Sequence, residues 1–155
     1  MNPGWRVPPA GPEAVLLDTN VFVSAVKDPA RQTATFRLIV NLLAREGVRF
    51  VGNDILAWEC LRYAQVFPSP TAAAIASAIL ERMEIVRVEE RFLMACAPYF
   101  GPGNASDCVH AATCLQTGAV LVSNDRDFDP VRRAGLVEVV TITDALRRWI
   151  PSRDG

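Results

Sequence analysis

The sequence predicts an α/β fold, with a mostly parallel sheet covered by helices on both faces. Short apolar runs of strand length alternate along the chain with longer segments whose apolar residues recur at helical spacing. Strands that alternate with helices pair in parallel, and right-handed crossovers wind the helices onto both faces. The chain has 155 residues, half of them apolar, which is enough for one domain with a sizeable core.

The first part of the chain predicts a lead-in, a strand and a helix. Residues 1–13 contain four prolines and two glycines and are expected to be flexible. Ala14–Leu17 is an apolar run that ends at Asp18, which is typical of a buried strand. Residues 30–46 are expected to form an amphipathic helix that Gly47 ends. Its apolar stripe consists of Phe36, Ile39, Val40 and Leu43.

The middle part predicts a strand and two helices. Residues 48–51 form a short apolar run of strand length. Asn53 is placed to cap a helix that runs to about residue 67. The expected buried face of this helix consists of Leu56, Cys60, Tyr63 and Phe67. After two prolines, an alanine-rich helix extends from Thr71 to about Met83.

Three strands and three helices are expected in the last part of the chain. The strands are residues 85–88, 119–122 and 137–142. The helices are residues 89–97, which Pro98 ends, residues 104–117, which Gly118 ends, and a last helix that Thr143 caps and Pro151 ends. The buried face of the second helix is expected at Cys108, Ala111, Ala112 and Leu115.

Composition narrows the class of protein. The formal net charge is -1, so no global basic field indicates a nucleic-acid partner. The four cysteines form no C-x-x-C pair and have no histidines at zinc spacing. This pattern indicates a protein from the reducing interior of a cell. No apolar run approaches the roughly 20 residues that span a bilayer. The start lacks the hydrophobic stretch of a secretory signal. We therefore expect a cytoplasmic protein without a membrane segment.

Two predicted strands end at clusters of polar residues. Asp18 and Asn20 follow the first strand in LLDTN, and Ser123, Asp125 and Asp127 follow the fourth in LVSNDRDF. Each residue alone is a common turn former. Together they offer hard oxygen ligands of the kind that Mg²⁺ or Mn²⁺ binds. In a parallel sheet such ligands lie beyond the carboxyl ends of the strands, where the strand order reverses.

Two further acids lie on predicted helices, and each has an ordinary structural explanation. Asp107 is in the first turn of its helix, where it complements the helix dipole and with Asn104 resembles a capping box. Glu59 borders the buried face of its helix and could form a surface pair with Arg62. The functional alternative is that both acids point to the same sheet end as Asp18.

Four segments carry these polar residues in order along the chain, namely LLDTNVF, NDILAWECLR, NASDCVHAATC and LVSNDRDF. Together they resemble PIN domains, and most closely the VapC-type toxins of bacterial and archaeal toxin–antitoxin pairs. The resemblance covers roughly residues 14–150 and leaves the lead-in of residues 1–13 and a tail of residues 151–155 outside. It implies a PIN-like three-layer fold with a five-stranded parallel sheet flanked by helices. The first and fourth strands are then neighbours, so Asp18 and Asp125 share one cleft.

The resemblance also implies a metal-dependent endoribonuclease that hydrolyses RNA phosphodiester bonds with Mg²⁺ or Mn²⁺. The expected metal ligands and catalytic residues are Asp18, Glu59, Asp107 and Asp125. Glu59 either binds the metal or orients the attacking water. Asn20 and Ser123 are expected to hold the carboxylates by hydrogen bonds. Asp127 is either a fifth acid or a turn residue.

The partners that the resemblance implies are RNA, a small antitoxin and a second copy of the chain. The tail of an antitoxin could fill the acidic cleft with an arginine. For the homodimer, the helix over residues 71–83 offers a face of small and apolar side chains, which could be either a core face or a subunit contact. This face consists of Ala72, Ala76, Ile79 and Leu80.

Three alternatives keep a similar sheet with another function. A catalytically inactive PIN-fold module would bind RNA or protein, but the intact acids argue against it. A phosphatase like the haloacid dehalogenases needs a second aspartate two residues after the first, where this chain has Asn20. A receiver domain like those of response regulators needs a late lysine, whereas Lys27 is the only lysine.

His110 and three arginines have less specific expectations. His110 could form a general-base pair with Asp107, but the resemblance gives it no role, and we expect packing or a surface hydrogen bond. Arg126, Arg132 and Arg133 follow the fourth strand and could contact RNA phosphate or remain solvated.

Overall fold

The computed structural model describes residues 12–27, 33–66 and 69–151. They form a five-stranded sheet in which every pair of neighbouring strands is parallel. The strands are β1 (Ala14–Leu17), β2 (Arg49–Gly52), β3 (Met83–Ile85), β4 (Val120–Val122) and β5 (Val139–Val140). The α-helices are α1 (Thr19–Val26), α2 (Ala34–Leu43), α3 (Asp54–Val66), α4 (Pro70–Arg82), α5 (Glu90–Cys96), α6 (Ala105–Thr117), α7 (Asp129–Arg133) and α8 (Ile142–Trp149). The predicted fold class is confirmed.

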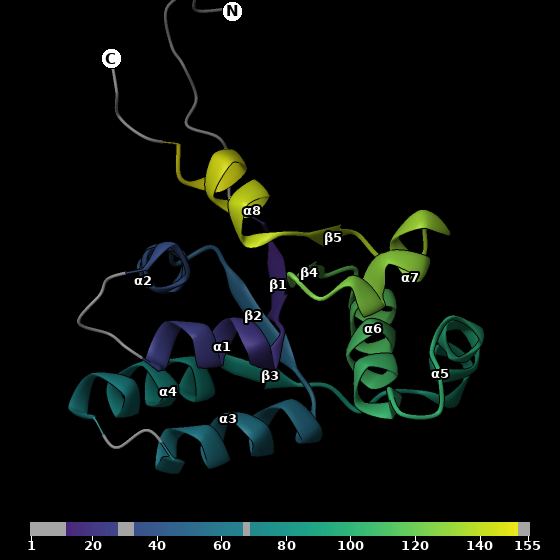
Figure 1. The fold of residues 1–155 in the computed structure, drawn as a ribbon, viewed down its shortest axis with the longest axis horizontal. Coiled ribbons are helices and arrows are strands. Elements are labelled where there is room, and N and C mark those ends of the chain that lie inside the picture. Colours follow the sequence, from purple (N-terminus) through teal and green to yellow (C-terminus); the bar gives the residue numbers. More distant parts are fainter. Residues whose placement is uncertain (1–11, 28–32, 67–68, 152–155) are drawn as a thin grey trace, which may run out of the picture.

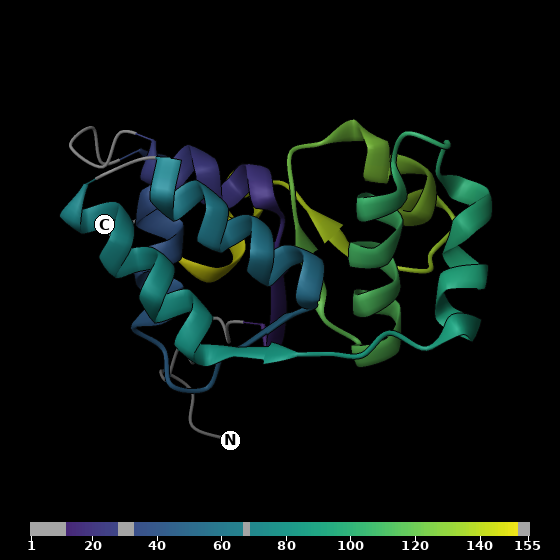
Figure 2. The same cartoon turned by 90° about the horizontal axis from the view of Figure 1, so that it is seen from below.

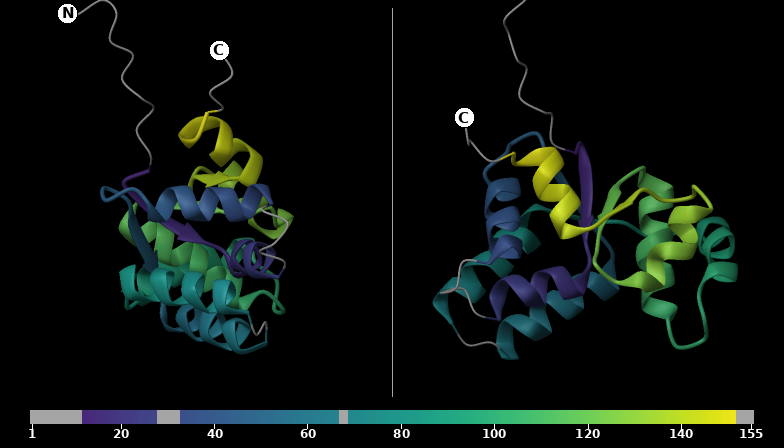
Figure 3. Two further views of the ribbon diagram at one scale, coloured as in Figure 1. Left: turned by 90° about the vertical axis from the view of Figure 1, so that its left-hand side faces the viewer. Right: turned by 45° about the horizontal axis from the view of Figure 1, so that its top comes forward.

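Helices lie on both sides of the sheet (Figure 1). Helices α1 to α4 gather on one side, and α5, α6 and α7 gather on the other, as the view from below also shows (Figure 2). Helix α8 packs against α2 (Figure 3). This arrangement is the three-layer fold that the alternation of elements predicts.

The strand order is β3-β2-β1-β4-β5, so the direction of winding reverses between β1 and β4. Leu17 at the end of β1 is in register with Val122 at the end of β4. All four residues of β1 are buried, as a central parallel strand requires. The prediction that the first and fourth strands are neighbours is therefore confirmed. The polar residues that follow these two strands lie at one edge of the sheet.

Several predicted boundaries are confirmed. Strand β1 has the predicted limits, and β2 is displaced by one residue. The side-chain oxygen of Asn53 accepts from the backbone N–H of Leu56 at 2.9 Å and caps α3, whose Leu56 and Cys60 are buried. Gly118 ends α6 with a φ of 75°, a left-handed conformation that favours glycine. Phe67 and most of the lead-in lie outside the described residues.

The first two helices differ from the prediction. Helix α1 was not predicted, because its eight residues directly follow Asp18 within the segment interpreted only as a polar cluster. Helix α2 is shorter than predicted and is rotated by about one position, so that Val40 is 42% exposed. Its buried residues are Thr35, Leu38, Ile39 and Leu42. Both sets have helical spacing, and packing against α1 and α8 determines which of them faces inward.

The predictions for the later strands and the last helix need smaller corrections. Strand β3 begins two residues earlier than predicted, at Met83, and β5 is confined to two residues. Thr141, and not Thr143, caps α8, since its hydroxyl oxygen accepts from the backbone N–H of Asp144 at 3.1 Å. A short 3₁₀ turn (Arg126–Phe128) and α7 occupy a segment with no predicted element. Within the described residues, no helix is long and apolar enough to cross a membrane.

Candidate metal centre

The ends of β1 and β4 carry two acids that a serine joins. Asp18 directly follows β1 and is only 3% exposed. The hydroxyl of Ser123, which follows β4, donates to Asp18 Oδ2 at 2.8 Å. The same hydroxyl oxygen accepts from the backbone N–H of Asp125 at 3.0 Å. The hydrogen bond expected of Ser123 is therefore present, and it links the two strand ends.

Asp125 and Asp127 lie in a tight turn after β4. Asp125 Oδ1 accepts from the backbone N–H of Asp127 at 2.9 Å and so caps the 3₁₀ turn. Phe128 buries its ring at the end of this turn, edge-on to Phe100. Asn124 Oδ1 accepts from the backbone N–H of Ile142 and ties the turn to the start of α8. These contacts hold the two carboxylates beside Asp107.

Asp107 comes to the site on the first turn of α6. One carboxylate oxygen each from Asp107, Asp125 and Asp127 lies within 4.8 Å of the other two. The backbone of Asp127 takes part in the turn, and its carboxylate lies in the acid cluster. These three acids are the closest group of potential metal ligands in the described part of the chain.

Glu59 faces the same site from α3. The hydroxyl of Thr19 donates to Glu59 Oε2. A cavity of about 240 Å³ brings Glu59 together with Asp18 and Asp107. The guanidinium of Arg62 lies over the Trp58 ring, 5.9 Å from its centroid, and no ion pair joins Arg62 to Glu59 among the described residues. The surface pair considered as an alternative for Glu59 is therefore not what the structure contains.

The acids raise one another's proton affinity. Burial, and then the charges of Asp18, Asp125, Asp127 and Glu59, raise the pKa of Asp107 to about 6. Burial also raises the pKa of Asp18, against the opposing effect of hydrogen bonds from Ser123 and from the Thr19 backbone. The charges of Asp125 and Glu59 raise the pKa of Asp18 further. The fold thus holds carboxylates close together at a cost in electrostatic energy.

A divalent cation fits this donor set. All candidate ligands are carboxylate oxygens, which are the ligands that Mg²⁺ and Mn²⁺ prefer. A bound cation would replace the repulsion between the carboxylates with attraction. No nitrogen or sulfur ligand belongs to the close group, whereas structural zinc sites are built from cysteine and histidine.

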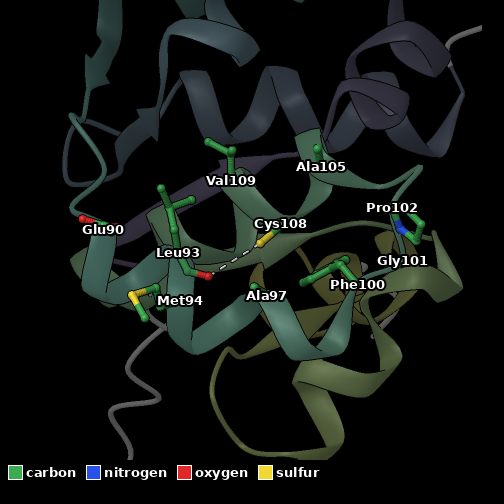
Figure 4. Close-up of a pocket in the computed structure, with 10 residues that line it drawn as sticks. All are labelled: Glu90, Leu93, Met94, Ala97, Phe100, Gly101, Pro102, Ala105, Cys108 and Val109. Carbon is green, nitrogen blue, oxygen red and sulfur yellow. Dashed lines mark hydrogen bonds between the residues drawn. The ribbon is translucent and has the colours of Figure 1, made fainter.

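A second and larger cavity lies on the other side of α6 (Figure 4). It has a volume of about 510 Å³ and lies between α5 and α6. Leu93, Met94 and Phe100 line it with other apolar side chains, and the thiol of Cys108 donates to the Leu93 carbonyl in its wall. Glu90 is the one charged residue among its lining residues. This cavity lacks the convergent carboxylates and is separate from the acid site.

The neighbours that support the acids differ from those predicted. Asn20 is exposed and lines the acidic cavity, but no hydrogen bond joins it to a carboxylate among the described residues. Thr19 instead makes the hydrogen bond to a carboxylate. Helix α1 begins at Thr19, and the Thr19 hydroxyl donates to Glu59 on α3. His110 also lines the cavity, where packing or a surface hydrogen bond was favoured over a general-base pair with Asp107. Its spacing of three residues from Asp107 places it on the same side of α6, as the pair considered from the sequence requires.

The family model described as PIN domain matches residues 15–134. No curated protein matches. Ten chains of solved structures match. One belongs to the crystal structure of VapBC2 from Rickettsia felis bound to a DNA fragment from their promoter. The TM-score is 0.59 at 16% sequence identity, and the match covers 83% of this chain and 98% of that chain. At this identity the likeness demonstrates the fold.

Proposed function

Because the chain belongs to the PIN-domain family, we propose that it is a metal-dependent endoribonuclease and the toxin of a toxin–antitoxin pair. The observation that carries this proposal is the convergence of acids at the point where the strand order reverses. Asp107, Asp125 and Asp127 approach one another within 4.8 Å, and Asp18 and Glu59 border the same site. In open parallel sheets, this edge is where ligands bind.

Asp107, Asp125 and Asp127 would hold Mg²⁺ or Mn²⁺, and Asp18 and Glu59 would bind it directly or through water. When bound, such an ion lowers the pKa of its water and stabilises negative charge on the phosphate. Ser123 keeps the Asp18 carboxylate turned toward the site. Thr19 holds the Glu59 carboxylate at the opposite wall, where it would orient the attacking water.

RNA phosphates need cationic contacts near these acids. Arg126 and Arg132 line a second polar cavity of about 230 Å³ together with Asp125. Arginine donates to phosphate oxygens in a planar fork, so this pair of side chains could position the RNA backbone. A local contact of this kind is consistent with a net charge of only -1.

The small antitoxin is proposed as a partner on two grounds. One chain of the VapBC2 structure, which is described as bound to a DNA fragment from their promoter, has this fold, and the VapC-type toxins that this chain resembles pair with a small antitoxin. The acidic cavity of this chain could accept an arginine from the tail of a partner protein, because a guanidinium would neutralise Asp18 and Glu59. An occupied cavity would exclude RNA and metal.

The homodimer is also part of the proposal, but on a different surface from the predicted one. Ala72, Ala76 and Ile79 of α4 are buried in the core, so the small-residue face of α4 is not a subunit contact. Helix α3 instead exposes a stripe of apolar residues. Ile55, Trp58 and Leu61 have exposed fractions of 38%, 62% and 51%.

The stripe on α3 is complementary to itself. Ile55 and Leu61 lie three residues before and after Trp58, and Asp54 and Arg62 lie four residues before and after it. Two copies of α3 packed antiparallel about a two-fold axis at Trp58 would therefore place each Asp54 opposite the partner's Arg62. Each Ile55 would face the partner's Leu61. This pattern of charge and apolar residues fits a second copy of the chain.

The direct test of the proposed function is cleavage of a single-stranded RNA by the purified protein. We expect cleavage with Mg²⁺ or Mn²⁺ and none in excess EDTA. Asp125→Asn serves as the matched control that keeps the side-chain shape. Full activity in EDTA would exclude the metal mechanism. No cleavage of any RNA, together with no binding of Mg²⁺ by calorimetry, would instead favour the inactive binding module.

A further inference from the structure

His110 occupies a defined place in the wall of the acidic cavity. It is the only histidine of the chain. The residue is 1% exposed, it lies one turn after Asp107 on α6, and it lines the cavity with Glu59. The residues around it determine which of its two ring nitrogens carries the proton.

Asn53 presents a donor to the histidine ring. Its Oδ1 accepts from the backbone N–H of Leu56 at 2.9 Å, as the cap of α3 requires. The orientation of the amide is thereby determined, and its Nδ2 faces His110 Nδ1 at 3.1 Å. Nδ1 must then be the unprotonated acceptor.

Thr113 supports the same orientation of Asn53. The Thr113 hydroxyl donates its only proton to the Val109 carbonyl at 2.8 Å. It can therefore only accept from Asn53 Nδ2, which lies 3.0 Å away. Both amide protons of Asn53 are used, one on Thr113 and one on His110. A neutral His110 consequently carries its proton on Nε2.

Nε2 faces Glu59. Its distance from Glu59 Oε2 is 4.0 Å, and the hydroxyl of Thr19 donates to that same oxygen. We propose that His110 is a positioning residue that, as the Nε2–H tautomer set by Asn53, orients the Glu59 carboxylate at the edge of the metal site. At 4.0 Å the two atoms are beyond hydrogen-bond distance, so in this structure the interaction is that of a nearby dipole with a charge, and such contacts often shorten when substrate binds.

A neutral donor suits this place better than a cation. An imidazolium would neutralise Glu59 and compete with a metal ion for it. Because Asn53 Nδ2 can only donate, His110 Nδ1 carries no proton and the ring is uncharged in this arrangement. The ring can therefore hold Glu59 and leave its negative charge available. The contact between His110 and Glu59 does not depend on the proposed function. Only the role of Glu59 at the metal site rests on it.

The contact is tested on the metal-free protein by nitrogen-15 NMR of the single imidazole. We expect one histidine, with Nδ1 unprotonated and Nε2 protonated. Glu59→Gln should shift the Nε2 and Hε2 resonances. Glu84→Gln, which removes an exposed glutamate charge beside Arg49, should leave them in place. A proton on Nδ1, or Nε2 resonances that Glu59→Gln does not move, would overturn the proposal. This measurement needs neither RNA nor metal, so its result is independent of whether the protein is a nuclease.

The effect on function is tested with a pair of variants. His110→Gln keeps an N–H donor near the position of Nε2, whereas His110→Leu has none. We expect His110→Leu to weaken Mg²⁺ binding or lower kcat by about 10-fold to 100-fold. His110→Gln should recover most of this loss, at a similar unfolding temperature. Equal losses in both variants would mean that the ring has only a packing role.

Discussion

At the residue scale, the acid cluster makes metal-free stability depend on pH through Asp107. Its pKa is raised from the ordinary 3.8 to about 6, so the folded protein binds this proton more tightly than the unfolded chain does. The stabilising effect of protonation is complete below the ordinary pKa and is lost as the pH rises toward 6. Above that pH the charged carboxylate destabilises the fold until a cation is bound.

We therefore expect Asp107→Asn to stabilise the metal-free protein relative to wild type, increasingly so between pH 4 and pH 7. Thermal unfolding in EDTA across this range measures the difference. Glu46→Gln, an exposed site, is the control and should show no such trend. A difference between Asp107→Asn and wild type that is constant across the range would contradict the electrostatic account.

Variants of Asp18 and Asp125 distinguish a role in catalysis from a role in folding. Each removal of a charge from the cluster relieves repulsion, so Asp18→Asn and Asp125→Asn should abolish RNA cleavage without lowering the unfolding temperature in EDTA. Both variants should also lose part of the rise in unfolding temperature that Mg²⁺ produces in wild type. Activity assays and unfolding with and without Mg²⁺ measure these effects. Unfolded protein in both variants would assign these acids a structural role.

At the element scale, Arg82 joins α4 to the connection between α2 and β2. Its guanidinium donates to the carbonyls of Leu43, Arg45 and Val48, and it lies over the Phe50 ring. These contacts hold the entry to β2 against the end of α4. The planar guanidinium of arginine makes all three hydrogen bonds at once. The single ammonium nitrogen of a lysine lacks this planar geometry and cannot reproduce them.

Arg82→Lys should lower the free energy of unfolding by about 1.5–3 kcal/mol, because hydrogen bonds from a charged donor are lost. Arg91→Lys is the matched control, since Arg91 pairs with Glu89 on the surface with 75% of its side chain exposed. The control should change stability by less than about 0.5 kcal/mol. Denaturant unfolding compares the two. Similar small effects in both variants would show that the contacts of Arg82 are not stabilising.

At the scale of the whole molecule, the proposed dimer through α3 makes a charge-reversal test available. Asp54→Arg would place two arginines opposite each other, and Arg62→Asp would place two aspartates opposite each other. We expect each single variant to raise the dissociation constant of the dimer by about 10-fold or more, or about 1.4 kcal/mol. The double variant should restore dimerisation, because the opposite charges face each other again.

Sedimentation measures the assembly of the four proteins at several concentrations. Recovery in the double variant cannot come from a general effect on solubility, because its net charge equals that of wild type. A wild-type protein that is monomeric at micromolar concentration would exclude the dimer. Dimers of equal strength in all four proteins would place the interface elsewhere on the surface.

Local patterns in the sequence determined the fold class and most of the elements. Apolar runs of strand length and helical stripes depend on near neighbours in the chain, so β1, α3 with its Asn53 cap and α6 with its end at Gly118 could be predicted. The capping box expected of Asn104 is absent, since its side chain makes no cap hydrogen bond. The acids at strand ends could be predicted for the same reason, since a parallel sheet brings its carboxyl ends to one edge. The rotation of α2 could not, because its inward face is determined by packing against α1 and α8.

Only the tertiary structure decided which side chains support the acids. Thr19 and Glu59 are 40 residues apart in the chain and meet because α1 and α3 pack together. Asn53 and His110 are 57 residues apart, and their hydrogen bond depends on how α6 lies across β2. Asp127 joins the cluster through a turn that a buried phenylalanine anchors. The sequence by itself determined that acids and a sheet edge are present, because these follow from local order. Distances between side chains on different elements follow from packing, which no single segment encodes.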